Sequence, residues 1–127
     1  YGFDDALYTA ARFIEIFTNS KQSPTELLAE LPDGVSTPEL RMPLSEDQHV
    51  GFMEELIEKM SVSGAETSDI DGLRIEYSDG WGLARPSNTS PNIIFRFEGE
   101  SEDALERIKS EFRAGIKLIV GETELPF

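Results

Sequence analysis

The stretch from Leu73 to Glu98 restricts the fold of this chain more than any other segment. Apolar and charged residues alternate from Leu73 to Tyr77, which is the pattern of a strand with one buried face. Asp79-Gly80 then provides a hairpin turn into a second strand, and residues 93–98 form a third. Three successive strands with short connections are typical of an antiparallel meander, so we expect an antiparallel sheet at the centre of the fold.

Extended and helical segments flank this meander. Val35 to Leu44 is predicted to be extended, and its prolines favour an edge strand. A capping box at Ser45–Gln48 starts a helix, and Ser101 caps a last helix whose apolar residues recur at helical spacing. Residues 61–68 are interpreted as a loop. The sequence thus predicts an α+β fold, with a four-stranded antiparallel sheet and two helices on one face. Residues 122–127 are too few for us to assign them a role.

The N-terminal part of the chain is predicted to be a separate helical unit. Asp4 or Asp5 can cap a first helix, and a capping box at Ser23–Glu26 starts a short second helix that ends near Leu31. The first helix has a broad apolar face that other elements must cover, so we expect its packing partners elsewhere in the polypeptide. Pro32-Asp33-Gly34 is interpreted as a linker and a domain boundary.

Charge and composition exclude several classes of function. The net charge is −14 at pH 7, so nucleic acids and anionic membranes are repelled at long range. No cysteine is present, which excludes disulfides and thiolate chemistry and fits a reducing cytosol. No apolar run approaches the roughly 20 residues of a membrane helix. The chain begins at Tyr1 without a methionine, which we interpret as a start within a longer polypeptide.

The segment Arg85–Pro91 is the strongest candidate for a binding site. It combines a guanidinium group, three hydroxyls and a side-chain amide in one turn bracketed by prolines. Arginine matches phosphate oxygens, and short polar side chains add donors beside it. No carboxylate occurs from Gly80 to Phe97, although the chain has 25 acidic residues among 127, so we expect this segment to avoid negative charge. The residues alone leave two interpretations open, a phosphate-binding loop and an ordinary surface turn.

Residues for catalysis or metal binding are not evident. His49, the single histidine, lies in the first turn of a predicted helix, where we interpret it as a capping or surface residue. Asp69 and Asp71 form one Asp-x-Asp pair, which is too few ligands for a metal site. We therefore expect no catalytic residue and no metal ligand in this chain.

A family resemblance extends through nearly the whole chain. Its most specific part is the run Gly80-Trp81-Gly82-Leu83-Ala84-Arg85-Pro86-Ser87-Asn88-Thr89-Ser90-Pro91. The specific stretch as a whole extends from Asp71 to Glu98 and includes the matches Asp71–Arg74 and Arg96–Glu98, whereas the flanking matches Gly2–Ala6 and Ser36–Glu39 are weaker. In this order they resemble the C-terminal part of bacterial phosphomannomutase/phosphoglucomutase, a branch of the α-D-phosphohexomutase superfamily. Asn88 resembles that branch more than the phosphoglucosamine mutases.

The resemblance implies a cytoplasmic, four-domain enzyme that interconverts hexose 1-phosphates and hexose 6-phosphates. A phosphoserine and Mg²⁺ would carry the transfer, with a hexose 1,6-bisphosphate as intermediate. Residues 1–34 would be the helical end of the third domain, and residues 35–127 the fourth domain, of TATA-box-binding-protein-like fold. The loop residues Arg85, Ser87, Asn88 and Thr89 would grip the phosphate that is not transferred.

The same resemblance implies that this chain is inactive by itself. We find no phosphoserine motif, no Asp-rich metal loop and no sugar-recognition motif, so the Mg²⁺ site would lie outside these 127 residues. The expected partners are a phosphosugar and the N-terminal domains of the same polypeptide. The alternative hypothesis is a non-catalytic, acidic α+β module that binds a basic protein and is indifferent to phosphate.

Overall fold

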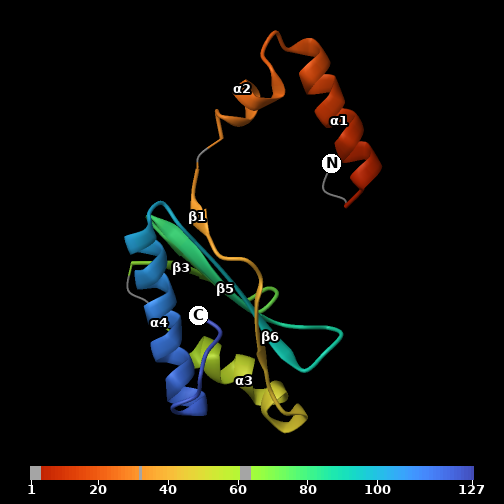
Figure 1. Ribbon diagram of the computed structural model, residues 1–127. Coiled ribbons are helices and arrows are strands. Elements are labelled where there is room, and N and C mark those ends of the chain that lie inside the picture. Colours follow the sequence, from red (N-terminus) through yellow and green to blue (C-terminus); the bar gives the residue numbers. More distant parts are fainter. Residues whose placement is uncertain (1–3, 32, 61–63) are drawn as a thin grey trace. The chain divides into compact units, whose positions relative to one another are not determined.

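The computed structural model describes residues 4–31, 33–60 and 64–127, and the chain divides into two compact units (Figure 1). The first unit is Tyr1–Asp33 and the second is Gly34–Phe127. The side chain of His49 lies outside the described part of the chain, and so does the expectation made for it. None of the helices in the described part is long and apolar enough to cross a membrane.

The first unit consists of two capped helices. Helix α1 is Ala6–Asn19, and the Asp5 carboxylate accepts a hydrogen bond from the backbone of Tyr8 at 2.9 Å. Helix α2 is Pro24–Leu28, with the expected capping box at its start. It ends three residues earlier than predicted. None of the described residues of either helix is buried, so the apolar face of α1 is exposed within this chain.

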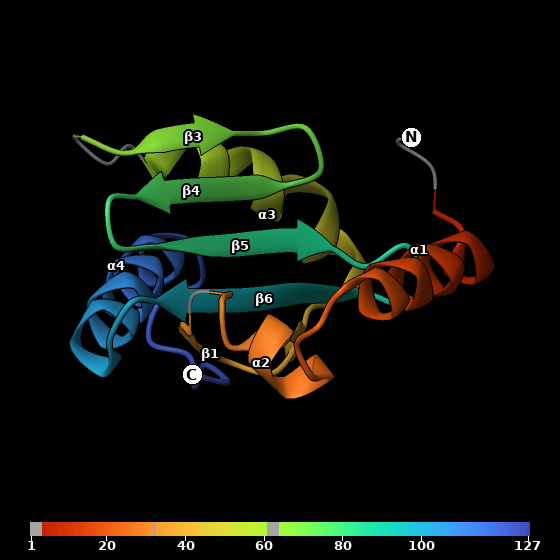
Figure 2. The same cartoon turned by 90° about the horizontal axis from the view of Figure 1, so that it is seen from above.

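The second unit is built on one antiparallel sheet. Its strands are β1 (Val35–Ser36), β2 (Leu40–Pro43), β3 (Glu66–Ser68), β4 (Leu73–Tyr77), β5 (Gly80–Pro86) and β6 (Asn92–Gly99). Figure 2 shows β3, β4, β5 and β6 side by side in that order. Both β1 and β2 pair with β6, at opposite ends, so they form one interrupted row at the sheet edge. The meander of β4, β5 and β6 confirms the prediction from the sequence.

The edge rows differ from the expectation in two ways. The extended segment 35–44 is broken at Thr37–Glu39, because its register against β6 shifts by one residue there: Ser36 pairs with Glu98, but Leu40 pairs with Phe95. The side chain of Thr37 partly replaces the missing pairing, since its hydroxyl accepts a hydrogen bond from the backbone of Phe97 at 3.1 Å. The sheet also has one row more than predicted, because part of the expected loop, Glu66–Ser68, pairs with β4. Backbone pairing needs no apolar side chain, so this polar strand gave no periodic signal.

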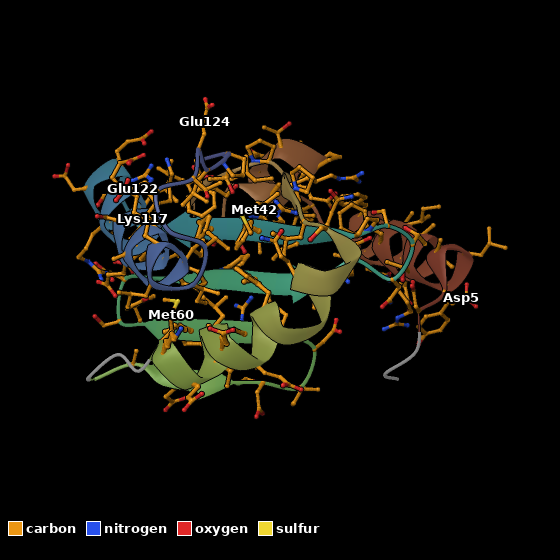
Figure 3. All side chains as sticks on the ribbon, turned by 90° about the horizontal axis from the view of Figure 1, so that it is seen from below. Asp5, Met42, Met60, Lys117, Glu122 and Glu124 are labelled. Carbon is orange, nitrogen blue, oxygen red and sulfur yellow. The ribbon has the colours of Figure 1, made fainter. Side chains whose placement is uncertain are left out.

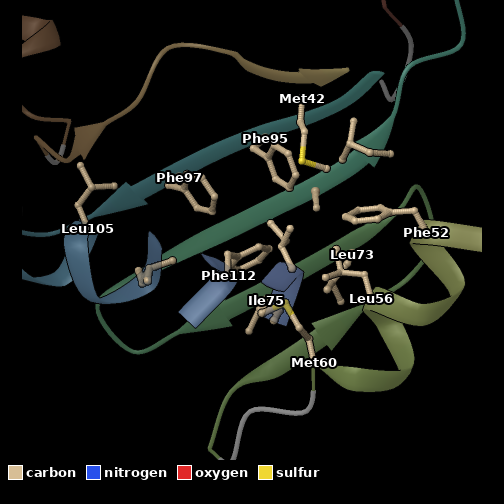
Figure 4. Close-up of a cluster of buried hydrophobic side chains, with 14 residues drawn as sticks. Met42, Phe52, Leu56, Met60, Leu73, Ile75, Phe95, Phe97, Leu105 and Phe112 are labelled. Carbon is tan, nitrogen blue, oxygen red and sulfur yellow. The ribbon is translucent and has the colours of Figure 1, made fainter. Parts of the chain in front are cut away.

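Two helices cover one face of the sheet, as predicted (Figures 1 and 2). They are α3 (Glu46–Lys59) and α4 (Glu102–Val120). Figure 4 shows the apolar cluster between them and the strands. Phe112 of α4 is fully buried, and its ring meets that of Phe97 edge-on at 5.1 Å. The apolar stripe of α4 confirms the periodicity read from the sequence, with these residues buried: Leu105, Ile108, Phe112 and Ile116.

The C-terminal tail contributes more than its length suggested. The ring of Phe127 packs 4.7 Å from that of Phe97, and Arg113 Nε donates a hydrogen bond to the Phe127 carbonyl at 2.7 Å. Figure 3 shows Lys117 and Glu122 close together, where their ion pair of 2.7 Å joins α4 to the tail. The tail therefore closes one end of the core, a role that six residues without periodicity did not predict.

Candidate functional site

The candidate loop, residues 87–91, joins two neighbouring strands of the sheet. It leaves β5 after Pro86 and enters β6 at Asn92. The Ser87 N–H donates to the Asn92 carbonyl at 2.9 Å, which closes the base of the loop. The Leu44 N–H donates to the Pro91 carbonyl at 2.9 Å, which ties the loop to the residue after β2. Both ends of the loop are thus fixed by the sheet.

The hydroxyl groups of the loop gather around Ser87. Its Oγ lies 3.1 Å from Ser90 Oγ and 3.5 Å from Thr89 Oγ1. The Thr89 N–H also donates to Ser87 Oγ, at 3.4 Å, and Asn92 Nδ2 donates to Ser90 Oγ at 2.7 Å. Hydroxyls donate and accept in turn, so this group can exchange its mutual hydrogen bonds for bonds to a ligand oxygen.

The four residues predicted from the sequence border one surface hollow of about 320 Å³. Arg85 forms its β5 side, and Ser87, Asn88 and Thr89 form its loop side. The remaining lining comes from residues that the sequence did not single out: Glu39, Arg41 and Ile94. The structure therefore brings the predicted residues together and adds a second arginine beside them.

Strand register explains why Arg41 lies at this hollow. Both Arg41 on β2 and Arg85 on β5 are the cross-strand partners of Ile94 on β6. Residues directly opposite one another share one face of a sheet. The neighbours Met42 and Ala84 belong to the core, so the two arginines point away from the helices. This register could have been predicted only if the pairing of residues 40–43 with β6 had been known.

Arg85 is held from its other side by the turn before β4. Its Nη1 lies 3.8 Å from Asp71 Oδ2, and its side chain is 34% exposed. Gly72 packs against the backbone of Arg85, because a Cβ at this position would lie 2.7 Å from Arg85 Cα and 2.4 Å from the Ala84 carbonyl oxygen. Gly72 also has a φ of +103°, which favours glycine. The turn therefore packs directly against the backbone of Arg85.

The absence of acidic residues along the segment 80–97 does not extend to its surroundings in space. Glu39 lines the hollow, and Asp71 faces Arg85 from a neighbouring turn. The expectation that the site avoids negative charge is therefore wrong in three dimensions. Carboxylates arrive through strand pairing and a turn, which a local sequence pattern cannot reveal.

Metal binding finds no support in the described part of the chain. Nowhere among residues 4–31, 33–60 and 64–127 do three His, Cys, Asp or Glu side chains converge as a metal site requires. Asp71, one of the Asp-x-Asp pair, is instead an ion-pair partner of Arg85.

The fold and the loop place the chain among α+β domains that present a polar loop beside an uncovered sheet face. Residues 39–115 match the family described as phosphoglucomutase/phosphomannomutase, C-terminal domain. The match covers more than half of the chain, including every strand from β2 to β6. The chain therefore belongs to the phosphoglucomutase/phosphomannomutase family.

Individual relatives agree with this assignment. The chain is 39% identical over 127 residues to phosphomannomutase/phosphoglucomutase of Pseudomonas putida, of which it spans 27%. It is 45% identical over 119 residues, 92% of its length, to phosphoglucomutase of Neisseria meningitidis serogroup B, of which it covers 26%. A crystal structure of a family protein from Burkholderia thailandensis superposes with a TM-score of 0.84 at 46% identity, covering 100% of this chain and 26% of that one. The chain thus spans about a quarter of the length of these relatives.

Proposed function

We propose that this chain is the phosphosugar-binding, C-terminal part of an enzyme that interconverts hexose 1-phosphates and hexose 6-phosphates. Residues 1–34 belong to the end of the preceding domain, and residues 35–127 form the domain that binds phosphate. The loop after β5 grips the phosphate that is not transferred. The observation that carries this proposal is the convergence of Arg85, Ser87, Asn88 and Thr89 on one hollow.

The chemistry of the hollow fits a phosphate monoester. The guanidinium of Arg85 offers a planar set of donors to two phosphate oxygens. The hydroxyls of Ser87 and Thr89 and the amide of Asn88 supply shorter donors from the loop. Because both ends of the loop are tied to the sheet, little ordering remains to be done when the ligand binds.

Binding a phosphate that does not react can still accelerate the reaction. Energy from contacts to a remote group orients the reacting group and favours closure around the substrate. A bisphosphorylated sugar that turns around within the active site would present either phosphate to the same loop. The transferring phosphoserine and the Mg²⁺ that supports it would lie outside this chain, so we expect the chain by itself to be inactive.

The test is a titration of the ¹⁵N-labelled chain with glucose 1,6-bisphosphate, for the wild type and Arg85→Ala. We expect saturable chemical-shift changes in the amides of Ser87–Ser90, with affinity about ten- to a hundredfold weaker in Arg85→Ala, because one charge-assisted donor is lost. Arg12→Ala, which removes an exposed arginine from α1, serves as the control with the same change in charge. Equal affinity of Arg85→Ala and wild type, or no saturable change at millimolar ligand, would contradict the proposal and favour the protein-interaction module.

A further inference from the structure

Two arginines, not one, border the hollow beside the loop. Arg41 on β2 and Arg85 on β5 flank Ile94 on the strand between them, all on the face that the helices leave uncovered. Neighbouring strands lie about 4.8 Å apart, so the two arginine Cα atoms are separated by about 10 Å. Two long side chains can close that distance around a single phosphate group. Arg41 therefore lies where a second cationic contact would be made.

Glu39 orients the guanidinium of Arg41 without occupying all of its N–H donors. Its Nε donates to Glu39 Oε1 at 2.8 Å, and its Nη2 lies 2.7 Å from the same oxygen. Among the described residues, Glu39 is the only partner of this side chain, so Nη1 keeps both of its donors. The Arg41 side chain is 65% exposed, so a ligand can reach it from solvent.

The charge of the hollow depends on Arg41. Without it, the charged lining would be Arg85 and Glu39, whose charges cancel. A phosphate monoester carries about −1.5 to −2 at neutral pH, so a hollow of zero net charge, with a carboxylate at its rim, attracts it poorly. Arg41 makes the lining net positive and so offsets Asp71, the carboxylate that faces Arg85 from the neighbouring turn.

We infer that Arg41 is a second phosphate-binding residue of this site. Its Nη1 group donates to the phosphate oxygens from the β2 side, while Glu39 holds Nε and Nη2 and so orients the guanidinium. The ligand is a sugar phosphate whose phosphate dianion is contacted from two sides by arginines. This inference rests on the proposed function of the loop and extends its contacts to the edge strand.

The experiment is a double-mutant cycle on the same chain, with glucose 1,6-bisphosphate as the probe and the amides of Ser87–Ser90 as the readout. We expect Arg41→Gln to weaken binding about three- to tenfold, less than Arg85→Ala because Arg41 is more exposed. Glu39→Gln should bind at least as tightly as wild type, since it removes a repelling carboxylate. The double variant Glu39→Gln/Arg41→Gln should bind the ligand more weakly than Glu39→Gln, by a factor similar to that of Arg41→Gln alone.

A matched control is Arg96→Gln. Arg96 is exposed on the same sheet face, two residues along β6 from Ile94, and does not line the hollow. Its loss changes the net charge equally without removing a contact to the ligand, so it should leave affinity within about twofold.

Two results would overturn the inference while leaving the proposed function intact. In the first, Arg41→Gln binds as well as wild type although Arg85→Ala is impaired. In the second, the double variant binds as tightly as Glu39→Gln, which would mean that Arg41 only neutralises Glu39. Absence of saturable binding by the wild-type chain, or an unimpaired Arg85→Ala, would overturn the proposed function as well.

Discussion

Gly72 lets the turn before β4 pack directly against the backbone of Arg85. Gly72 combines a φ of +103° with a close approach to the backbone of β5, so a side chain at this position is both strained and obstructed. The obstruction involves Ala84 and Arg85 themselves. Because these contacts are to backbone atoms, they cannot be relieved by a change of rotamer.

We expect Gly72→Ala to destabilise the chain by about 2 to 4 kcal/mol, through left-handed strain and overpacking together. It should also weaken glucose 1,6-bisphosphate binding, because relief of the contact moves Arg85. Urea unfolding and the ¹⁵N titration measure the two effects. The control is Gly121→Ala, where φ is +71° and no atom lies within 4 Å of the added Cβ. If the two variants were equally stable and bound ligand equally, the close packing of the turn on β5 would not matter.

The sequence predicted those site residues that are contiguous in the chain and missed those that pairing brings in. Arg85, Ser87, Asn88 and Thr89 could be grouped because one turn contains them. Glu39 and Arg41 reach the hollow through the register of an edge strand, and Asp71 reaches Arg85 through a turn that packs on β5. Register is a property of two segments at once, so no pattern within either segment reveals it.

At the scale of elements, helix α4 packs closely on the sheet where the large side chain of Phe112 lies against Gly82. A Cβ on Gly82 of β5 would lie 2.4 Å from Phe112 Cε2, so the ring of Phe112 occupies the space that a side chain at 82 would fill. A polar contact between α4 and the sheet accompanies these apolar ones. Arg107 lies over the ring of Tyr77 at 4.9 Å and forms ion pairs with Asp79 and Glu111. Helix α4 thus has one charged anchor beside its apolar stripe.

The Tyr77 hydroxyl makes the charged anchor dependent on pH. Burial raises the pKa of Tyr77 above its ordinary value, and the nearby carboxylate of Glu111 raises it further because it favours the protonated hydroxyl. The unfolded chain then releases this proton first, at a pH near 10, so the folded state holds the proton more tightly. The resulting stabilisation is complete below that pH and is lost as the pH rises toward the folded pKa.

We therefore expect the free energy of unfolding of the wild type, relative to Tyr77→Phe, to be constant between pH 7 and 9 and to fall from about pH 10 upward. Urea unfolding of both proteins at half-unit intervals measures this difference. A difference that stayed constant through pH 11, or grew, would show that the pKa of Tyr77 is not raised by folding.

At the scale of the whole molecule, the buried apolar residues are confined to one of the two units. Every buried hydrophobic residue in the described part of the chain belongs to Gly34–Phe127. Capping boxes and apolar periodicity predicted helices in both units, because these signals are local. They did not show which helix has a core to pack against, since burial depends on what surrounds a helix. Exposed Leu7 and buried Leu56 both lie on apolar faces in the sequence, at 85% and 0% exposure.

This contrast gives a test with two helices of equal length. Helices α1 and α3 each have 14 residues and an N-terminal cap, but Phe52 and Leu56 of α3 are buried, whereas no described residue of α1 is. A helix of about this length is marginal in water without tertiary packing. Amide hydrogen exchange should therefore show weak protection throughout α1 and, in α3, protection near that of global unfolding. Equal protection of the two helices would mean that α1 is stabilised by packing that burial within this chain does not account for, and the assignment of the core to the second unit alone would have to be abandoned.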